Sequence, residues 1–312
     1  MTIPIGDESE SERAAVEISV VIPCRNGAMT LKEQLDSLAA QQTEYVYEVI
    51  VANNGSTDST ADLVARYATE HPHVKLTDAS ESSGINVARN AGVRFSRGKY
   101  VLLCDADDVV HPGWIQAYGE AFAEGATCVG GRLDRELPDG TVLSRQSELS
   151  RTNFSAIAYP VGANCGFTRS VFEELGGFNE SFAGGSDEIE FFWRAQAAGH
   201  PTFLVPGAVI SYRVRAEPRE LVRQYYRYGR GNARLIREFG TSSQLRRELL
   251  LFPFRWLRAL AAMTLSRPQS ARRRGGLEGF GFQLGMIGDS VSRSRTVCSN
   301  RLQAGIDSRA GE

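Results

Sequence analysis

The chain has 312 residues, enough to bury a large core in one domain with an appendage or in two domains. Hydrophobic residues make up 42% and charged residues 23%, values that exclude a fibrous or wholly disordered protein. The net charge of −2 is unevenly spread, because residues 252–312 hold ten arginines, no lysine and four acidic residues. This basic end favours either an anionic partner, such as a membrane surface or nucleic acid, or a solvated arginine-rich face.

Cysteine usage and the first residues indicate the cellular compartment. The five cysteines are odd in number and form no Cys-x-x-Cys pair, which is typical of a reducing compartment. Residues 1–15 are predicted to be an acidic, disordered N-terminus, the opposite of a secretory signal. The most apolar segment, 249–265, is interrupted by Pro253, Arg255 and Arg258, so we do not expect it to span a membrane. We expect a cytoplasmic protein, with peripheral contact at the inner face of the membrane as the only membrane association.

Short apolar strands alternate with amphipathic helices along residues 16–125. The expected strands are 18–22, 46–52, 74–76 and 100–104, and the expected helices begin near Leu31, Ala61 and Val87. Thr30 and Glu33 form a capping-box pattern at the first helix, and Ser56 or Thr57 is a plausible cap for the second. This alternation predicts βαβ units and a parallel sheet.

The pattern changes after Gly125. Residues 130–151 are predicted to be strands and loops of an irregular region, and residues 162–213 form a second organised block. Beyond residue 215 the spacing of apolar residues becomes helical, while the glycine-rich stretch 275–289 permits no assignment. Three regions are therefore expected, with the last one helical.

Three polar clusters directly follow expected strands, at residues 23–26, 53–58 and 105–108. Parallel strands place their carboxyl ends on one edge of a sheet, where ligands bind, so the clusters should share one site. Asp105 and Asp107 at the end of a buried strand would repel each other unless paired. A divalent cation would relieve this repulsion and would also bridge a diphosphate.

Other interpretations of the aspartates stay open. An apolar strand followed by Asp-x-Asp also resembles an Asp-nucleophile phosphatase, although that motif normally opens its domain and two βα units precede it here. A metal-dependent nucleotidyltransferase would use a related fold and the same cation. A calcium loop would need glycine where Val110 stands, and a solvated acidic turn is the purely structural interpretation.

Several ordered motifs resemble family 2 glycosyltransferases: Ile18–Asn26, Glu48–Asp58, Gly84–Asn90, Leu103–Asp108, Leu175–Glu180 and Asp187–Arg194. The resemblance implies the GT-A fold, a Rossmann-like, mostly parallel α/β sheet flanked by helices, with a C-terminal helical extension added here. It implies that residues 16–125 bind a nucleotide sugar and that residues 126–215 bind the acceptor and carry catalysis. Residues 216–312 lie outside it and form a basic helical region for which a membrane surface is a candidate partner.

The resemblance also implies a role for individual residues. The residues implied to bind the nucleotide sugar are Pro23, Arg25, Asn26, Asn53, Asp58, Arg89, Asp105 and Ala106. Asp107, with Asp105, would hold Mn²⁺ or Mg²⁺. Counting back from Glu190 and Arg194 places Glu188 at the position of the catalytic base, with Asp187 just before it.

The expected reaction is transfer of a sugar, with inversion, from a nucleotide-diphosphate donor to a hydroxyl of a glycan, lipid-linked or small-molecule acceptor. Asn53 stands where the family commonly has Asp, Ser211 where relatives often have a metal-binding His, and Glu188 where Asp is more usual. The first two departures keep open a nucleotide-sugar-binding pseudoenzyme. No nucleic-acid-binding motif is present, so nucleic acid is not an expected partner.

Overall fold

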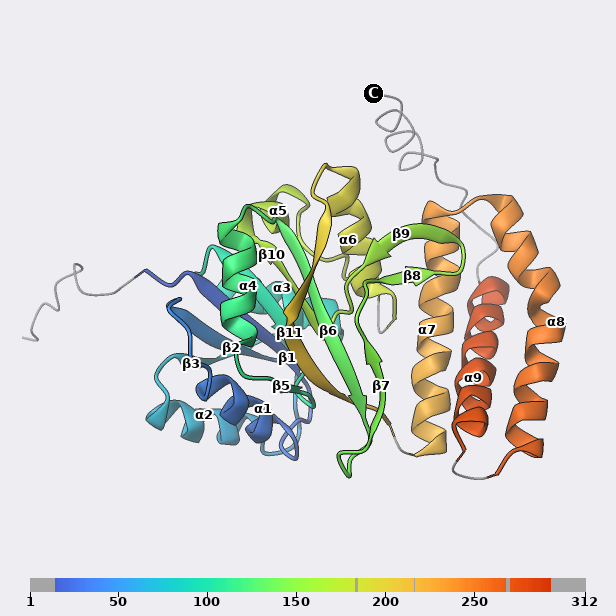
Figure 1. The fold of residues 1–312 in the computed structure, drawn as a ribbon, viewed down its shortest axis with the longest axis horizontal. Coiled ribbons are helices and arrows are strands. Elements are labelled where there is room, and N and C mark those ends of the chain that lie inside the picture. The colour runs from blue at the N-terminus through green and yellow to red at the C-terminus, as the bar shows by residue number, and fades with distance from the viewer. Residues whose placement is uncertain (1–14, 183–184, 216, 268–269, 293–312) are drawn as a thin grey trace, which may run out of the picture.

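The computed structural model describes residues 15–182, 185–215, 217–267 and 270–292 (Figure 1). The prediction of a disordered N-terminus at residues 1–15 therefore lies almost wholly outside the described residues.

The first half of the central sheet is parallel, as the sequence predicts. Its strands pair in the order β3-β2-β1-β4. They are β1 (Ile18–Cys24), β2 (Tyr47–Asn53), β3 (Val74–Asp78) and β4 (Tyr100–Cys104), connected by helices α1 (Leu31–Ala39), α2 (Thr60–Glu70) and α3 (Ile85–Phe95). The helices begin within two residues of their expected starts, but the expected caps differ: Ser59, and not Ser56 or Thr57, precedes α2, and the Thr30 side chain makes no capping hydrogen bond.

The second half of the sheet is mixed. Beyond β4 the order continues β10-β6-β11-β5, with β10 antiparallel to both neighbours and β6 parallel to β11, so that the described residues form one nine-stranded sheet. The strands are β5 (Val109–Val110), β6 (Cys128–Glu136), β7 (Val142–Gln146), β10 (Asn164–Thr168) and β11 (Thr202–Arg213), and a separate hairpin pairs β8 (Ser150–Thr152) with β9 (Ser155–Tyr159). The helices here are α4 (Trp114–Ala123), α5 (Arg169–Glu174) and α6 (Asp187–Ala197).

Alternate residues of the strands face two different cores. Val20 and Ile22 pack with residues of α1, α2 and α4, whereas Val21 packs with residues of α3, α5 and α6 on the other face. Both faces are covered, which explains why these strands are apolar throughout and not alternating. Helices cover both faces of the sheet, so the polar loops that follow the strands are what remains exposed at its edge.

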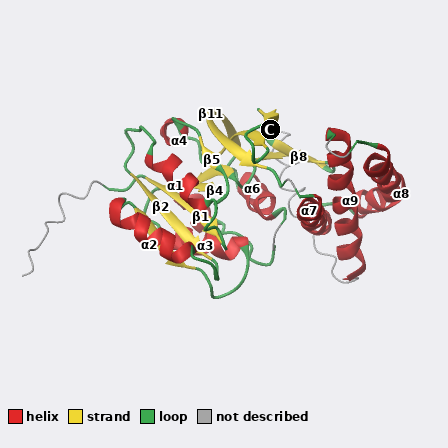
Figure 2. Cartoon of the chain, turned by 90° about the horizontal axis from the view of Figure 1, so that it is seen from below, coloured by secondary structure: helices red, strands yellow, loops and turns green. Residues whose placement is uncertain are grey.

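The C-terminal region is helical and lies beside this α/β body (Figures 1 and 2). Its helices are α7 (Pro218–Phe239), α8 (Ser242–Leu265) and α9 (Ala271–Ser292). Helix α7 is next to the body and α9 packs between α7 and α8, which leaves α8 on the far side. Among the described residues, no helix combines the length and the apolar character needed to cross a bilayer.

Glycines in both helices allow α7 and α9 to approach closely. This contact explains why residues 275–289, which the sequence left unassigned, are part of a helix. A Cβ atom on Gly285 would lie 2.0 Å from the carbonyl oxygen of Tyr226, and one on Gly229 would lie 2.0 Å from the carbonyl oxygen of Phe282. Glycine weakens an isolated helix, so this stretch carries little local helical signal. The packing of α9 against α7 supplies the stabilisation that the local helix propensity of α9 does not provide.

Replacing Gly285 by alanine should therefore separate α7 from α9. We expect Gly285→Ala to lower the free energy of unfolding by about 1–3 kcal/mol, because a backbone carbonyl cannot move out of the way of the new methyl group. The matched control is Gly275→Ala, since nothing lies within 4 Å of a Cβ there. The control should instead stabilise α9 by about 0.5–1 kcal/mol. Equal effects of the two substitutions in urea unfolding would contradict the close contact.

Candidate functional site

A cavity of about 930 Å³ opens at the carboxyl ends of β1 and β4. The residues from the α/β body that line it include Pro23, Arg25, Asn54, Arg89, Asp105, Asp107, Asp187 and Glu188. The edge of the sheet therefore brings together residues from segments more than 80 positions apart in the chain. This is the location that the strand pattern predicts for a ligand site.

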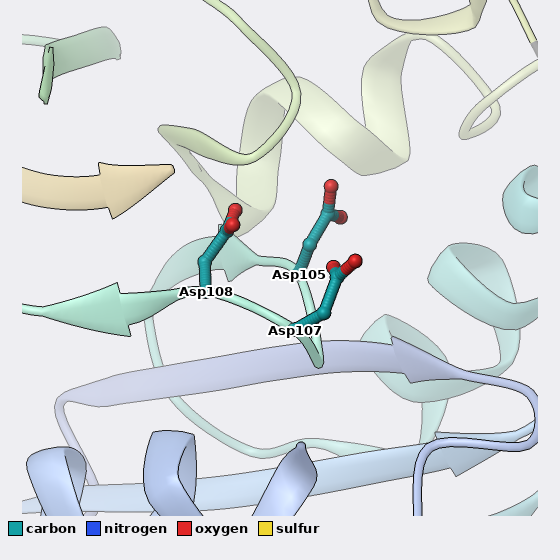
Figure 3. Close-up of side chains that lie close together, drawn as sticks. All are labelled: Asp105, Asp107 and Asp108. Carbon is teal, nitrogen blue, oxygen red and sulfur yellow. The ribbon is translucent and has the colours of Figure 1, made fainter. Parts of the chain in front are cut away.

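Three aspartates after β4 form an acidic cluster (Figure 3). One carboxylate oxygen from each of Asp105, Asp107 and Asp108 can be chosen so that all lie within 4.8 Å of one another. Asp105 and Asp107 are half-buried and line the cavity, while Asp108 is buried and accepts a hydrogen bond from the backbone N–H of Arg213 at 2.9 Å. Asp108 was not predicted as a site residue.

The charges in this cluster are only partly compensated within the protein, by Arg215 and Arg89. Burial raises the pKa of Asp105 to about 6, with Arg89 opposing and Asp107 adding to the rise. Burial, together with Asp105 and Asp107, raises the pKa of Asp108 well above its ordinary value. One oxygen of Asp108 is buried without a hydrogen-bond partner. Oxygen ligands under mutual repulsion are the donor set that a hard divalent cation prefers, so these residues fit such an ion.

A buried ion pair joins helix α3 to helix α6. The guanidinium of Arg89 contacts the carboxylate of Asp187, and the two side chains are only 3% and 7% exposed. Burial alone would lower the pKa of Arg89, but Asp187, Asp105 and Glu188 raise it. Arg89 thus lines the cavity, as predicted for a residue near a diphosphate, yet its nearest anion in the structure is Asp187.

Glu188 follows Asp187 in the first turn of α6, but its carboxylate does not take part in the ion pair between Asp187 and Arg89. Among the described residues, no ion pair to its carboxylate is present, and the backbone N–H of Glu188 itself donates a hydrogen bond to it. Burial raises its pKa to about 7, Asp187 adds to the rise and Arg89 opposes it. A carboxylate with a pKa near neutrality can accept a proton at physiological pH.

The other predicted nucleotide-binding residues hold loops and do not line the cavity. The side-chain oxygen of Asn26 accepts from the N–H of Thr57 at 2.8 Å, and Asn53 accepts from the N–H of Ser56 at 3.0 Å. Asp58 accepts from the N–H of Ala28 at 3.1 Å. These contacts tie the loop after β1 to the loop after β2. Ala106 packs against the core between the two aspartates.

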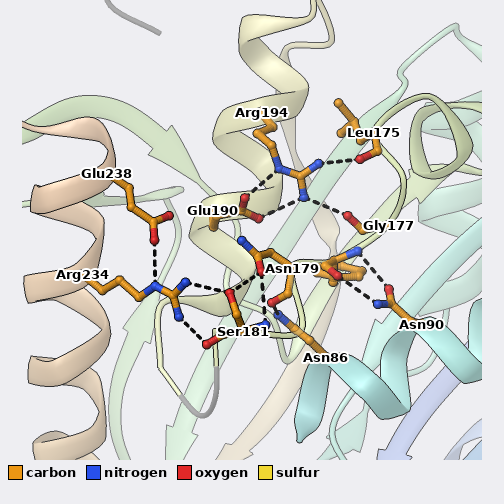
Figure 4. A network of polar contacts seen from close by, with 11 residues as sticks. Asn86, Asn90, Leu175, Gly177, Asn179, Ser181, Glu190, Arg194, Arg234 and Glu238 are labelled. Carbon is orange, nitrogen blue, oxygen red and sulfur yellow. Dashed lines mark hydrogen bonds and ion pairs between the residues drawn. The ribbon is translucent and has the colours of Figure 1, made fainter. Parts of the chain in front are cut away.

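The motif at residues 175–180 anchors the loop that leads to α6 (Figure 4). Arg194 contacts both carboxylate oxygens of Glu190, at 2.8 and 2.9 Å, and donates to the carbonyls of Leu175 and Gly177. Further contacts to residues 178–181 come from Asn86, Asn90 and Arg234. Glu190 and Arg194 therefore have a structural role here, which separates them from the neighbouring Asp187 and Glu188.

The sequence of the chain matches the profile described as Glycosyl transferase family 2 over residues 19–176, half of its length. The chain belongs to this glycosyltransferase family. A second profile, Glycosyl transferase family group 2, matches residues 100–271. The fold, the site at the sheet edge and the acidic cluster are all consistent with this membership.

Individual relatives of this glycosyltransferase are distant or matched only in part. It is 40% identical over 96 residues to the uncharacterized glycosyltransferase YibD of Escherichia coli, which is 31% of this chain and 27% of that protein. It is 25% identical to glycosyltransferase AglE of Haloferax volcanii, over 69% of this chain and 72% of the relative. The mannosyltransferase PcManGT from Pyrobaculum calidifontis, solved with GDP-Man and Mn²⁺, is 18% identical with a TM-score of 0.56, covering 96% of this chain and 81% of that one. This likeness shows the GT-A fold.

The C-terminal part of the transferase also lines the cavity, which the sequence did not predict. The lining residues on α7 are Glu220, Arg223, Gln224, Arg227 and Tyr228, and those at or just after the end of β11 are Tyr212, Arg213 and Arg215. Arg215 forms an ion pair with Asp107 at 2.8 Å. Arg223 and Arg227 lie one turn apart on α7 and are exposed, and the described residues offer neither of them a carboxylate partner. Because Arg223 and Arg227 lie within a helix and not at a strand end, the strand-end rule could not find them.

A second cavity, of about 980 Å³, lies between the body and helices α7 and α9. Five residues line both cavities: Val161, Glu188, Tyr212, Gln224 and Tyr228. Glu188 is the only one of the five with a carboxylate. The two cavities therefore meet at Glu188.

Ser211 lines neither of the two cavities. Its hydroxyl donates to Glu136 at 2.9 Å and lies 2.9 Å from Nε2 of His111. The next residue on β11, Tyr212, lines both cavities, as expected from the alternation of side chains along a strand.

Removal of the buried guanidinium should destabilise the fold as well as the site. We expect Arg89→Met to lower the free energy of unfolding by about 3–5 kcal/mol, because it leaves the Asp187 carboxylate buried without its counter-ion. The matched control is Arg94→Met on the same helix, whose side chain is 62% exposed and 4.0 Å from Glu180. That substitution should change the free energy by less than about 1 kcal/mol. Urea denaturation of both variants measures the difference, and similar losses would contradict a special role for Arg89.

Proposed function

We propose that the protein transfers a sugar, with inversion, from a nucleotide-diphosphate sugar in the first cavity to an acceptor hydroxyl that enters from the second. The observation that carries this proposal is the position of Glu188, which lines both cavities and has a pKa of about 7. A base at this junction can take a proton from a nucleophile on one side while a leaving group departs on the other.

The first cavity suits a diphosphate because cations surround the acidic cluster. A divalent cation held by Asp105 and Asp107 would neutralise charge on the departing nucleotide diphosphate as a Lewis acid. Arg25, Arg223 and Arg227 bring guanidinium groups to the same cavity, where their geometry suits phosphate oxygens. Arg215 now compensates Asp107, and it becomes available to the diphosphate when a cation takes over that role. PcManGT, solved with GDP-Man and Mn²⁺, supports a donor of this class.

The choice of Glu188 over Asp187 as the base rests on their partners. Asp187 forms a buried ion pair with Arg89, so its carboxylate positions that guanidinium. Among the described residues Glu188 has no such counter-ion, and its raised pKa suits a residue that accepts a proton near neutral pH. Asp187 still adds negative charge beside Glu188, which helps to raise that pKa.

The second cavity suits a polyhydroxylated acceptor such as a glycan. Its lining includes four tyrosines: Tyr159, Tyr212, Tyr225 and Tyr228. Tyrosine rings offer flat apolar surfaces with a polar edge, which sugars can stack against while their hydroxyls stay hydrogen-bonded. The hydroxyl to be glycosylated would then approach Glu188 from this side.

Family membership sets the other interpretations aside. The match to the glycosyltransferase family argues against a phosphatase or a nucleotidyltransferase. A pseudoenzyme would not need a base with a raised pKa between two cavities. We place the reaction in the cytoplasm, which agrees with the four described cysteines, all free and buried.

Donor binding can be tested by thermal shift with UDP-, GDP-, dTDP- and CDP-sugars, each with Mn²⁺ or with EDTA. One nucleotide sugar with Mn²⁺ should raise the melting temperature, since a ligand at about 100 times its Kd stabilises the folded state by about 2.7 kcal/mol. Asp107→Ala should abolish the shift, whereas Asp62→Ala, an exposed acid in the first turn of α2, should keep it. A full shift in EDTA would contradict the cation site, and no shift with any donor would contradict the transferase proposal.

The pH dependence of turnover tests Glu188. Its pKa is raised, and the deprotonated form is the active one, so kcat at saturating donor and metal should fall about tenfold per unit as the pH drops below about 7. Glu188→Gln should lower kcat by about 10²–10⁴-fold, while the thermal shift with donor is retained.

The control for this experiment is Glu180→Gln, an exposed residue outside both cavities, which should leave kcat and its pH profile unchanged. Asp187→Asn should lower the free energy of unfolding, because Arg89 loses the charge of its buried partner. We do not expect it to remove the fall in kcat at acidic pH. Equal kcat values for Glu188→Gln and Asp187→Asn, or an acidic limb near pH 4.5, would show that Glu188 is not the base.

A further inference from the structure

Helix α8 exposes large apolar side chains in one row. The exposed fractions are 73% for Leu250, 73% for Phe254, 60% for Leu257 and 79% for Leu265. The first three are spaced by four and three residues and Leu265 follows eight residues later, so all four lie on the same face of the helix. Scattered exposed apolar residues need no explanation, but four on one helical face form a patch.

This face points away from the rest of the protein. Ala259, which is only 6% exposed, lies on the opposite side of α8, and the backbone there is close to Gly276 of α9. Helix α8 is also the outermost helix of the C-terminal region in both views (Figures 1 and 2). The apolar row is therefore open to a partner and is not part of the contact with α9.

Arginines border the row, and acidic side chains do not. Arg247 and Arg258 are exposed on α8, and Arg267 and Arg272 are exposed at the connection to α9. Glu248 is the only acid in the sequence of α8, and it is buried and paired with Arg255. The accessible surface around the apolar row is thus positively charged.

An anionic lipid surface fits this combination better than a second copy of the chain. In a two-fold symmetric dimer through this face, the arginines of one copy would meet those of the other, which is unfavourable. At a bilayer, the apolar row would enter the boundary between headgroups and acyl chains, and the arginines would meet anionic headgroups. Because no described helix can cross a bilayer, the helix would lie in the plane of the surface.

We propose that the exposed face of α8 docks the protein onto the surface of an anionic membrane, with Leu250, Phe254 and Leu257 inserted and Arg247 and Arg258 at the headgroups. This docking surface lies apart from both cavities, because none of these five residues lines either of them. The proposal can therefore hold or fail independently of the proposed reaction.

The experiment is co-sedimentation of the full chain with vesicles of phosphatidylcholine containing phosphatidylglycerol, compared with vesicles of phosphatidylcholine alone. The wild-type chain should bind the anionic vesicles, and the triple variant Leu250→Gln, Phe254→Gln, Leu257→Gln should lower its partition coefficient by at least about tenfold. Arg247→Gln with Arg258→Gln should lower it by about fivefold per arginine in dilute salt and have little effect in concentrated salt.

The controls change similar side chains on the α/β body. Val46→Gln, Phe95→Gln and Phe203→Gln alter residues that are 38%, 48% and 50% exposed, and Arg66→Gln with Arg94→Gln removes the same charge as the arginine variant. Both should bind vesicles like the wild type. The proposal is overturned if the wild type does not sediment with anionic vesicles, or if the α8 and control variants bind alike. It is also overturned if the apolar row instead forms a dimer in analytical ultracentrifugation that the triple variant abolishes.

Discussion

The buried contact between Arg89 and Asp187 connects the two halves of the α/β body and sets the electrostatics of the site. Arg89 comes from the helix before β4, and Asp187 begins the helix before β11. A guanidinium that is almost fully desolvated needs compensating charge, and the carboxylates of Asp187, Asp105 and Glu188 provide it. The same arrangement keeps the pKa of Glu188 near neutrality, since burial and Asp187 raise it while Arg89 lowers it. Gly162 makes room for this cluster, because a Cβ atom there would lie 2.6 Å from Nη2 of Arg89.

The strand-end pattern explains why part of the site could be predicted from the sequence. Asp105 and Asp107 follow a continuous apolar strand, and the sheet does bring them beside residues 23–25 and 187–188. The precise contacts could not be predicted in the same way. Asn26, Asn53 and Asp58 have motif positions that the resemblance assigns to the nucleotide, while in the structure their side chains connect two loops.

The parts that escaped prediction depend on contacts between distant elements. Arg223 and Arg227 reach the cavity because α7 packs beside the body, and nothing in their local sequence indicates this. Arg215 lies two residues after β11, a strand that the sequence did not assign. Helix α9 has a weak helical signal because it is rich in glycine, yet those glycines permit its close contact with α7. In the mixed half of the sheet, residues 130–151 were expected as strands and loops of an irregular region and residues 162–213 as an organised block without assigned strands, since β10 and β6 pair with strands that are far away in sequence. The capping pattern at Thr30 shows the converse, a local signal whose hydrogen bond is not formed.

The contribution of α9 to the second cavity has a consequence for the order in which the protein acquires its parts during synthesis. The described residues that line the first cavity end at Tyr228, whereas those that line the second extend to Phe282. Chains emerge from the ribosome N-terminus first, and folding follows as units become complete. The described residues that line the first cavity are therefore all synthesised before α9 begins. The second cavity gains its α9 wall only after that helix has been synthesised, so a chain truncated before α9 would keep the lining residues of the first cavity and lack part of the second.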